Sequence, residues 1–480
     1  MDLLDPLDSL MLTAELISSP MHVAALMILR PPPGSDPAAY VTELFEQTLT
    51  AAVAVDRRLR RVPHSGIDTG FMWVWRDISD SGGQLDIRHH FQRRTVAADG
   101  GPDVLWELVS ELHALRLDRS APLWMAYLID GLPDGRFALY IKVHHIVVDG
   151  VAGMQMLTGS LSTDPDRRGM PPFYAATTPA TTPQAKLERA ATATGPRRPP
   201  HVLSALRGIA EAASAGMELT GRVVRTELRT AVGSLVSRSV AAPFSAPQTR
   251  FNTKLGPRRA VAGVSVRRDR IRAVQQAAGV TGNDVMMAVV SAALRRWLAD
   301  RDELPARSLV AICPVTVRSR DTAAADSHGN QFGMGLCPLA SDVDDAAQRL
   351  RLVHEAMAEI KNQVAEQGPG AMLLALGPAI GPTILLPLLP FDTDIPPSFN
   401  IPVSNVPGPK DQMYFNGAHV DEIYPVSTVY DGMALNVTMC SYGDRISVGY
   451  VADRDVVPDI ATLIPLTDQA LSDVEAAVGV

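Results

Sequence analysis

Two adjacent histidines carry the strongest chemical signal in the sequence. They open the segment HHIVVDG, residues 144–150, directly after the β-rich run FALYIKV that begins at Phe137. Adjacent side chains at the end of a strand point to opposite faces, so only one imidazole can readily face a given cleft. A histidine with a pKa near neutrality can take a proton from an attacking hydroxyl and return it to a thiolate leaving group. The segment is therefore suited to direct acyl transfer, and Asp149–Gly150 is typical of a turn into a following helix.

Other interpretations of the histidine pair remain open at this point. The two side chains could be buried, hydrogen-bonded strand residues, or remnants without a catalytic role. Zinc binding is disfavoured, because adjacent strand histidines diverge and no third ligand stands at a familiar spacing. The sequence contains no GxSxG nucleophile elbow and no glycine-rich phosphate loop, which argues against a serine hydrolase or a kinase.

The HHxxxDG pattern is the signature of a superfamily of CoA-dependent acyltransferases. That superfamily includes chloramphenicol acetyltransferase-like enzymes and the condensation domains of peptide synthetases. Further motifs follow in order along nearly the whole chain: PLDSLMLTAE, PMHVAAL, APLWMAYLIDGL, GNDVMMAVV, PVTVR, GNQFG and SNVPGP. Together these motifs resemble the bacterial wax ester synthase/diacylglycerol acyltransferase family, of the kind abundant in mycobacteria.

The resemblance implies both a fold and a reaction. The fold is an α/β sandwich of two chloramphenicol acetyltransferase-like lobes with a solvent channel between them. The reaction transfers a fatty acyl group from acyl-CoA to diacylglycerol, or to a long-chain alcohol, which gives triacylglycerol or a wax ester. His145 is the implied general base beside His144, while Asp149 turns away from the channel and pairs with an arginine. Arg60, Arg61 and Arg318 are the candidates for that partner.

Three polar residues in the second half are candidates for contact with the substrate. Attack on a thioester builds negative charge on the carbonyl oxygen, which requires preorganised donors. Asn283 stands at the start of a predicted helix, and the resemblance places Asn283 and Asp284 beside the channel; the alternative is a plain helix cap. Asn405 of SNVPGP either orders its loop or donates to substrate. A fourth candidate lies in the first half: Gly150 allows the backbone to turn and the substrate to pass close by.

The elements that must position these residues fall into two similar halves. The first half predicts a buried strand over 20–30, amphipathic helices over 40–61 and 104–118, and the strand that ends at the histidines. The second half predicts helices over 281–300 and 342–367 and strands over 308–318, 434–443 and 445–452. Between them lie a segment rich in Pro, Thr, Ala and Arg and an amphipathic helical pattern over 201–239. We therefore predict an N-terminal acyltransferase lobe over 1–160, a linker with an amphipathic helix over 161–250, and a C-terminal acyltransferase-like lobe over 251–480.

Composition narrows the class of protein. The chain has 480 residues, of which 46% are hydrophobic and 20% charged, as in globular proteins. The net charge of −8 argues against a nucleic-acid partner, because no basic excess exists to neutralise phosphates. Three widely spaced cysteines form no metal or disulfide pattern, and the acidic N-terminus does not fit a signal peptide. We expect a cytoplasmic enzyme with no metal and no bound cofactor, acyl-CoA being a substrate.

Two further segments bear on contact with lipid and CoA. The uncharged stretch from Gly368 to Phe391 is long enough to cross a bilayer but contains five prolines, so it either faces a membrane, lines an acyl tunnel or forms buried core. The arginine-rich run over 254–272 either attracts CoA phosphates or is a solvated face. We expect peripheral association with a membrane or lipid-droplet surface. The alternatives are an enzyme that uses another alcohol or an amine as acceptor, and a catalytically weak lipid-binding protein.

Overall fold

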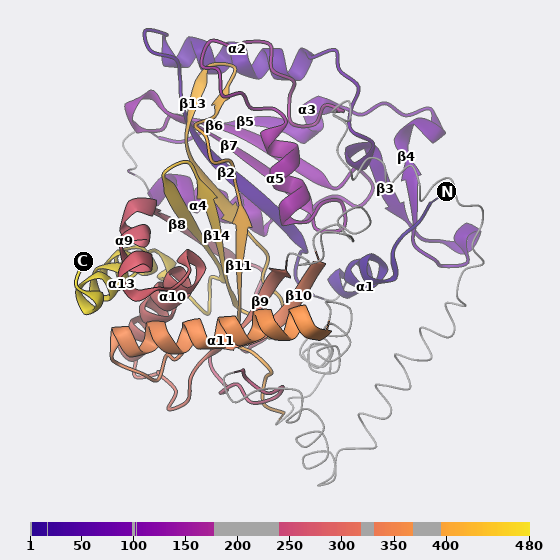
Figure 1. The fold of residues 1–480 in the computed structure, drawn as a ribbon. Helices are drawn as coiled ribbons and strands as arrows, with labels where there is room; N and C mark the ends of the chain where they lie inside the picture. The colour runs from indigo at the N-terminus through magenta and orange to yellow at the C-terminus, as the bar shows by residue number, and fades with distance from the viewer. Residues whose placement is uncertain are drawn as a thin grey trace.

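Two mixed six-stranded sheets, one in each lobe, form the framework of the computed structural model (Figure 1). The structure describes residues 2–16, 18–97, 101, 103–176, 240–317, 331–367 and 395–480. The sheet of the first lobe has the order β12 (Tyr414–Phe415), β13 (Ala418–Val426), β2 (His22–Arg30), β7 (Phe137–His144), β6 (Trp124–Asp130) and β5 (Phe91–Thr95). The sheet of the second lobe has the order β10 (Gln331–Pro338), β9 (Val310–Val317), β11 (Ile401–Pro407), β14 (Leu435–Tyr442), β15 (Arg445–Asp453) and β8 (Arg259–Arg267). The two-lobed α/β arrangement predicted from the sequence is present.

A small third sheet and a short helix complete the first lobe near the N-terminus. The sheet consists of β1 (Asp2–Leu3), β4 (Val74–Asp77) and β3 (Arg61–His64), and the helix is α1 (Pro6–Glu15). The other helices of this lobe are α2 (Pro37–Thr50), α3 (Ile87–His90), α4 (Asp103–Ala114) and α5 (Gly150–Thr158). The helix expected over 40–61 ends at Thr50, and a short 3₁₀ turn over Arg57–Arg60 follows it after a break.

Helices pack against the sheet of the second lobe and share one hydrophobic core with it. They are α9 (Arg268–Ala278), α10 (Gly282–Ala299), α11 (Ala346–Gln367) and α13 (Leu463–Val478). Residues 284–294 of α10 are all buried, which explains why its sequence is apolar on nearly every side. Both long helices predicted for this half, over 281–300 and 342–367, are confirmed.

A strand exchange ties the lobes together. The chain leaves the second sheet after β11, contributes β12 and β13 to the first sheet, and returns with β14. At the junction, a Cβ atom on Gly263 of β8 would lie 2.5 Å from the Trp106 ring of α4 and 2.6 Å from the Tyr424 ring of β13. The lobes are therefore joined by a shared sheet and a close-packed core. Sequence reasoning did not foresee β13, and the lobe boundaries at residues 160 and 250 remain a prediction.

Several predicted features fall outside the described residues. They are the amphipathic helix over 201–239, most of the linker, the apolar stretch from Gly368 to Phe391, and Arg318. Among the described residues, no single helix is long and apolar enough to cross a membrane, although α9 and α10 meet that test as a pair bent by 104°.

Candidate active site

The histidine pair lies at the end of a central, fully buried strand. All eight residues of β7 are buried, and β7 pairs with β2 on one side and with β6 on the other. The chain then turns, with the N–H of Val147 donating to the carbonyl of His144 at 2.9 Å. Asp149 caps α5 by accepting a hydrogen bond from the N–H of Ala152 at 2.7 Å. The helix expected to begin at Asp149–Gly150 is confirmed, so β7 holds one end of the HHIVVDG segment and α5 holds the other.

His145 is the partly exposed member of the pair. Its backbone N–H donates to the carbonyl of Met21 at 2.9 Å, while its side chain is half-buried. Burial lowers the pKa of the His145 imidazole, the nearby Asp149 carboxylate opposes that shift, and the charge of His144 adds to it. A lowered pKa keeps the imidazole neutral near pH 7, the form that can accept a proton.

His144 is built into the core instead. Its side chain is 1% exposed, and its Nε2 atom lies 3.3 Å from Oε2 of Glu15 in α1. Its Nδ1 atom lies 3.3 Å from the backbone N–H of Ile146. The two rings thus occupy different environments. Because the His144 side chain is almost fully buried, it is poorly placed to exchange a proton with a substrate.

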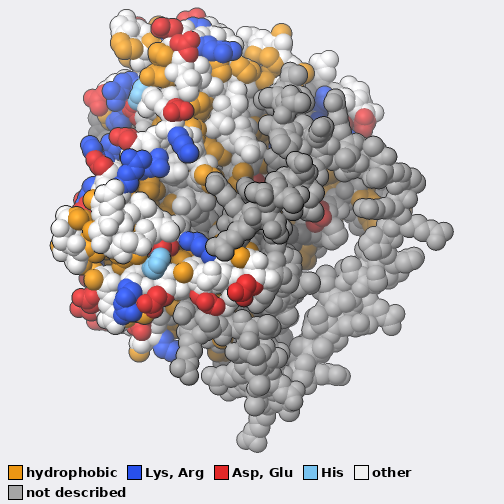
Figure 2. Space-filling view, viewed as in Figure 1, with side chains coloured by type: hydrophobic (Ala, Val, Ile, Leu, Met, Phe, Trp, Pro, Cys, Tyr) orange, Lys and Arg blue, Asp and Glu red, His pale blue; other side chains and the backbone are white. Residues whose placement is uncertain are grey.

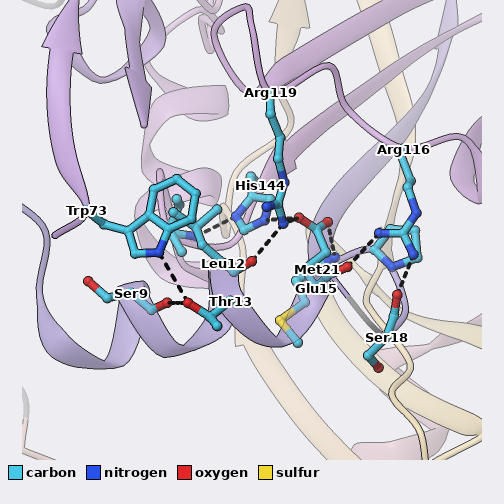
Figure 3. Close-up of polar contacts among 12 residues, drawn as sticks. Ser9, Leu12, Thr13, Glu15, Ser18, Met21, Trp73, Arg116, Arg119 and His144 are labelled. Atoms are coloured by element: carbon cyan, nitrogen blue, oxygen red, sulfur yellow. Dashed lines mark hydrogen bonds and ion pairs between the residues drawn. The ribbon is translucent and has the colours of Figure 1, made fainter. Parts of the chain in front are cut away.

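Glu15 is a buried carboxylate that sequence reasoning missed (Figure 3). Its side chain is 6% exposed; Oε1 accepts the N–H of Met21 at 3.0 Å, and Oε2 binds Arg119 as well as His144. Burial by itself would raise the pKa of Glu15, but hydrogen bonds to His144, Arg119 and the N–H of Met21, together with charge on His144, lower it to about 2. The segment PLDSLMLTAE was noted only as a family motif. The sequence signal that could have identified Glu15 is an acidic residue at the C-terminal end of an apolar helix.

Asp149 has no arginine partner among the described residues. Its side chain is exposed and serves as the cap of α5. Arg60 and Arg61 bind aspartates of the small sheet instead, and Arg318 lies outside the described residues. The structure supports a loop-shaping role for Asp149 through helix capping.

Three of the candidate residues meet at the junction of the lobes. A Cβ atom on Gly150 would lie 3.2 Å from Cγ2 of Val406 in β11. The neighbouring Asn405 donates its side-chain Nδ2–H to Oδ1 of Asn283, near the start of α10, at 3.3 Å. The start of α5, the end of β11 and the start of α10 therefore converge: Asn405 directly precedes Val406, and its hydrogen bond brings the amide of Asn283 to the same place.

Asp284 does not join this group. Its carboxylate is 1% exposed, forms a capping box with Thr281, and accepts a hydrogen bond from His354 Nδ1 of α11 at 2.7 Å. Lys361 of the same helix lies 3.9 Å away. This placement argues against the expected position beside a reacting carbonyl, because the side chain is directed into the second lobe. Thr281 and Asn283 are both suitable N-caps by residue type, and the structure uses Thr281.

The basic run over 254–272 is largely neutralised within the protein. Arg258, Arg267 and Arg270 each form an ion pair with a carboxylate, which favours the interpretation of this run as a solvated face. On the described part of the face in Figure 2, basic and acidic side chains are interspersed rather than gathered into one basic patch. Within the described ranges, no group of three or more His, Cys, Asp or Glu side chains could hold a metal ion.

Comparisons with known proteins agree with this fold. Residues 4–286 match the model of the wax ester synthase/diacylglycerol acyltransferase catalytic domain, and residues 328–475 match the WS/DGAT C-terminal domain. The chain is 37% identical over 489 residues to a Mycobacterium tuberculosis H37Rv protein named "Probable diacyglycerol O-acyltransferase tgs2", with 100% of both chains covered. The structure of a wax ester synthase/diacylglycerol acyltransferase from Marinobacter aquaeolei VT8 superposes with a TM-score of 0.76 at 30% identity, again over 100% of both chains.

A more distant structural relative confirms the fold alone. The first condensation domain of the CDA synthetase superposes with a TM-score of 0.56 at 16% identity, over 99% of this chain and 96% of that domain. The two-lobed fold predicted from HHxxxDG is therefore confirmed. From the two matching domain models and the full-length relatives, we conclude that this chain belongs to the wax ester synthase/diacylglycerol acyltransferase family.

Proposed function

We propose that this protein transfers a fatty acyl group from acyl-CoA to diacylglycerol, forming triacylglycerol and free CoA. Long-chain alcohols are alternative acceptors that give wax esters. The observation that carries the proposal is His145, a half-buried imidazole with a lowered pKa in an intact HHIVVDG segment of a chain from this family.

The chemistry requires one proton carrier and no covalent enzyme intermediate. His145 takes the proton from the acceptor hydroxyl as its oxygen attacks the thioester carbonyl carbon. The carbon–sulfur bond then breaks, and the imidazolium returns the proton to the departing CoA thiolate. The negative charge of Asp149 favours the imidazolium during this cycle, since it opposes the lowering of the His145 pKa. The amides of Asn283 and Asn405 are our candidates for donors to the carbonyl oxygen.

The acceptor and the product are barely soluble in water, so we place the reaction at a membrane or lipid-droplet surface on the cytoplasmic side. A cavity of about 380 Å³ at the C-terminal end of α5 supports an apolar substrate, because Met156, Pro171, Pro172 and Phe173 line it. α5 runs for nine residues from Gly150 to this end, a length of roughly 13 Å at 1.5 Å per residue. That length is within reach of a fatty acyl chain bound at the site.

Acceptor choice is tested by measuring CoA release with diacylglycerol, hexadecanol or a primary amine supplied separately. We expect turnover with diacylglycerol and hexadecanol; turnover with the amine alone would replace our proposal with the rival acyltransferase. His145→Ala should lower kcat by about 10²- to 10⁴-fold, the usual contribution of a general base. His354→Ala, which alters a partly exposed histidine of the second lobe, is the matched control. Equal rates for wild type and His145→Ala would defeat the base assignment.

A further inference from the structure

One oxygen of the Glu15 carboxylate leads through Met21 to the main chain of His145, and the other leads through His144 to Ile146, the residue after the base. We propose that Glu15 is a positioning residue that orients His145 by holding its main chain on one side and the turn after it on the other. This inference rests on the proposed function, since it assigns His145 as the base. The evidence is a ring of hydrogen bonds that begins and ends at this carboxylate.

The first arm of the ring runs through Met21. Oε1 of Glu15 accepts the backbone N–H of Met21 at 3.0 Å. The carbonyl of Met21 in turn accepts the backbone N–H of His145 at 2.9 Å. Glu15 thus fixes the residue that holds the main chain of His145, at the point where the chain leaves β7.

The second arm runs through His144 and determines its tautomer. The N–H of Ile146 is a donor, so Nδ1 of His144, 3.3 Å away, must be the unprotonated nitrogen. The proton of a neutral ring is then on Nε2, which donates to Oε2 of Glu15 at 3.3 Å. Glu15 therefore selects the tautomer that allows His144 to accept from the residue after the base. An uncharged side chain without two acceptor oxygens could not complete both arms.

Two arginines keep the carboxylate in place in this buried position. Arg119 binds Oε2 of Glu15 and donates to the carbonyl of Leu12 at 2.8 Å, while Arg116 donates to the carbonyl of Glu15 at 2.9 Å (Figure 3). The low pKa of Glu15 agrees with this geometry, because a carboxylate with these partners stays ionised throughout the pH range in which a histidine base works. The end of α1 is thus fixed against the loop that carries the base.

Glu15→Gln changes the hydrogen bonding of this side chain while keeping its size. Glutamine has one acceptor oxygen and one donor group, so it can complete only one arm. If its oxygen accepts from Met21, its NH₂ group faces the Nε2–H of His144, and the ring must move or shift its proton to Nδ1, where it opposes the N–H of Ile146. We expect kcat to fall about 100-fold, the effect of displacing a catalytic group by about 1 Å, while KM for acyl-CoA changes less than about threefold. Glu15→Asp keeps both oxygens and should recover part of the rate.

The matched control is Asp130→Asn. Asp130 is a partly buried carboxylate of the same lobe, 15% exposed and bound to Arg93, at the end of β6 away from His144. This variant should lose stability but keep the kcat of the folded enzyme. A double-variant cycle with His144→Asn adds a readout that a purely structural role would not give. If Glu15 acts through His144, the combined loss of kcat is smaller than the product of the two separate losses.

Spectra of ¹⁵N-histidine-labelled protein test the ring independently of turnover. We expect the Nε2-protonated tautomer of His144 in wild type and its loss in Glu15→Gln. A wild type with Nδ1 protonated, or a Glu15→Gln enzyme with unchanged kcat, would overturn the inference. A wild type that releases no CoA would instead defeat the proposed function, while the histidine spectrum still decides whether the ring exists. If Glu15→Gln does not fold, the kcat of Glu15→Asp and the histidine spectrum of the wild type test the inference instead.

Discussion

Replacing Lys142 with methionine should remove a pH dependence of stability from the strand that carries the histidines. Lys142 lies two residues before His144 in β7, and it is 1% exposed. Its ammonium group donates to the carbonyls of Leu112 and Leu115, each at 2.7 Å, near the C-terminal end of α4. Burial lowers the pKa of Lys142 to about 7 from 10.5.

The sign and size of the effect follow from this shift. Between pH 7 and 10.5 the amine is largely neutral in the folded protein and protonated in the unfolded chain, so the unfolded state binds more protons. Raising the pH through this window therefore stabilises the folded protein. The destabilisation caused by burying the charged amine is largest below pH 7 and disappears above pH 10.5. With about 1.4 kcal/mol per pKa unit, the lysine contributes a gain of roughly 2 kcal/mol between pH 7 and pH 9.

The measurement is equilibrium unfolding in urea at pH 7, 8 and 9 for wild type and Lys142→Met. The free energy of unfolding of wild type should rise relative to that of the variant by roughly 2 kcal/mol over this range. Lys361→Met, which removes a 39% exposed lysine of α11, should follow the wild-type pH dependence. Parallel curves for wild type and Lys142→Met would refute the reasoning, because they would show that the buried amine does not titrate in this window.

Two further predictions concern the junction of the lobes and the cap of α10. Gly150→Ala places a Cβ atom 3.2 Å from Val406, so we expect CoA release to slow by about tenfold with Tm nearly unchanged. Gly153→Ala is the control: its Cβ would lie 3.7 Å from the nearest neighbour, and it should alter neither the rate nor Tm. Asp284→Ala removes a helix cap and the partner of His354, and it should lower the free energy of unfolding in urea by about 1–3 kcal/mol while the folded enzyme keeps most of its kcat. A large loss of kcat at unchanged stability would return Asp284 to the role that the sequence predicted.

Local patterns account for what the sequence predicted correctly. The strand ending at His144, the helix starting at Gly150 and the long apolar helix α10 each depend on residues within one short segment. Alternation, helical periodicity and capping residues report such elements directly. The ordered motifs then implied the family, and the matching domain models confirmed it.

The features that were missed depend on contacts between distant segments. Glu15 and His144 are 129 positions apart, and nothing in the composition around Glu15 indicates which side chain it binds. Asn283 and Asp284 are adjacent in the sequence, yet the start of α10 directs one toward Asn405 and the other toward His354. Neighbouring residues in a helix are separated by roughly 100° around its axis, so the two residues of a motif need not face the same site.

The strand exchange bears on how substrates reach the base. β13 from the second half pairs with β2 along most of its length, from Arg30 opposite His419 to Ala24 opposite Val426, and β2 pairs directly with β7. β11, which precedes β13, contacts the loop after the base at Gly150. Hinge separation of the lobes would therefore break sheet hydrogen bonds and expose the core around Tyr424, which is far more costly than moving side chains or loops. We infer that acyl-CoA and the lipid alcohol reach His145 by local rearrangement around β11 and α5 while the two lobes stay joined.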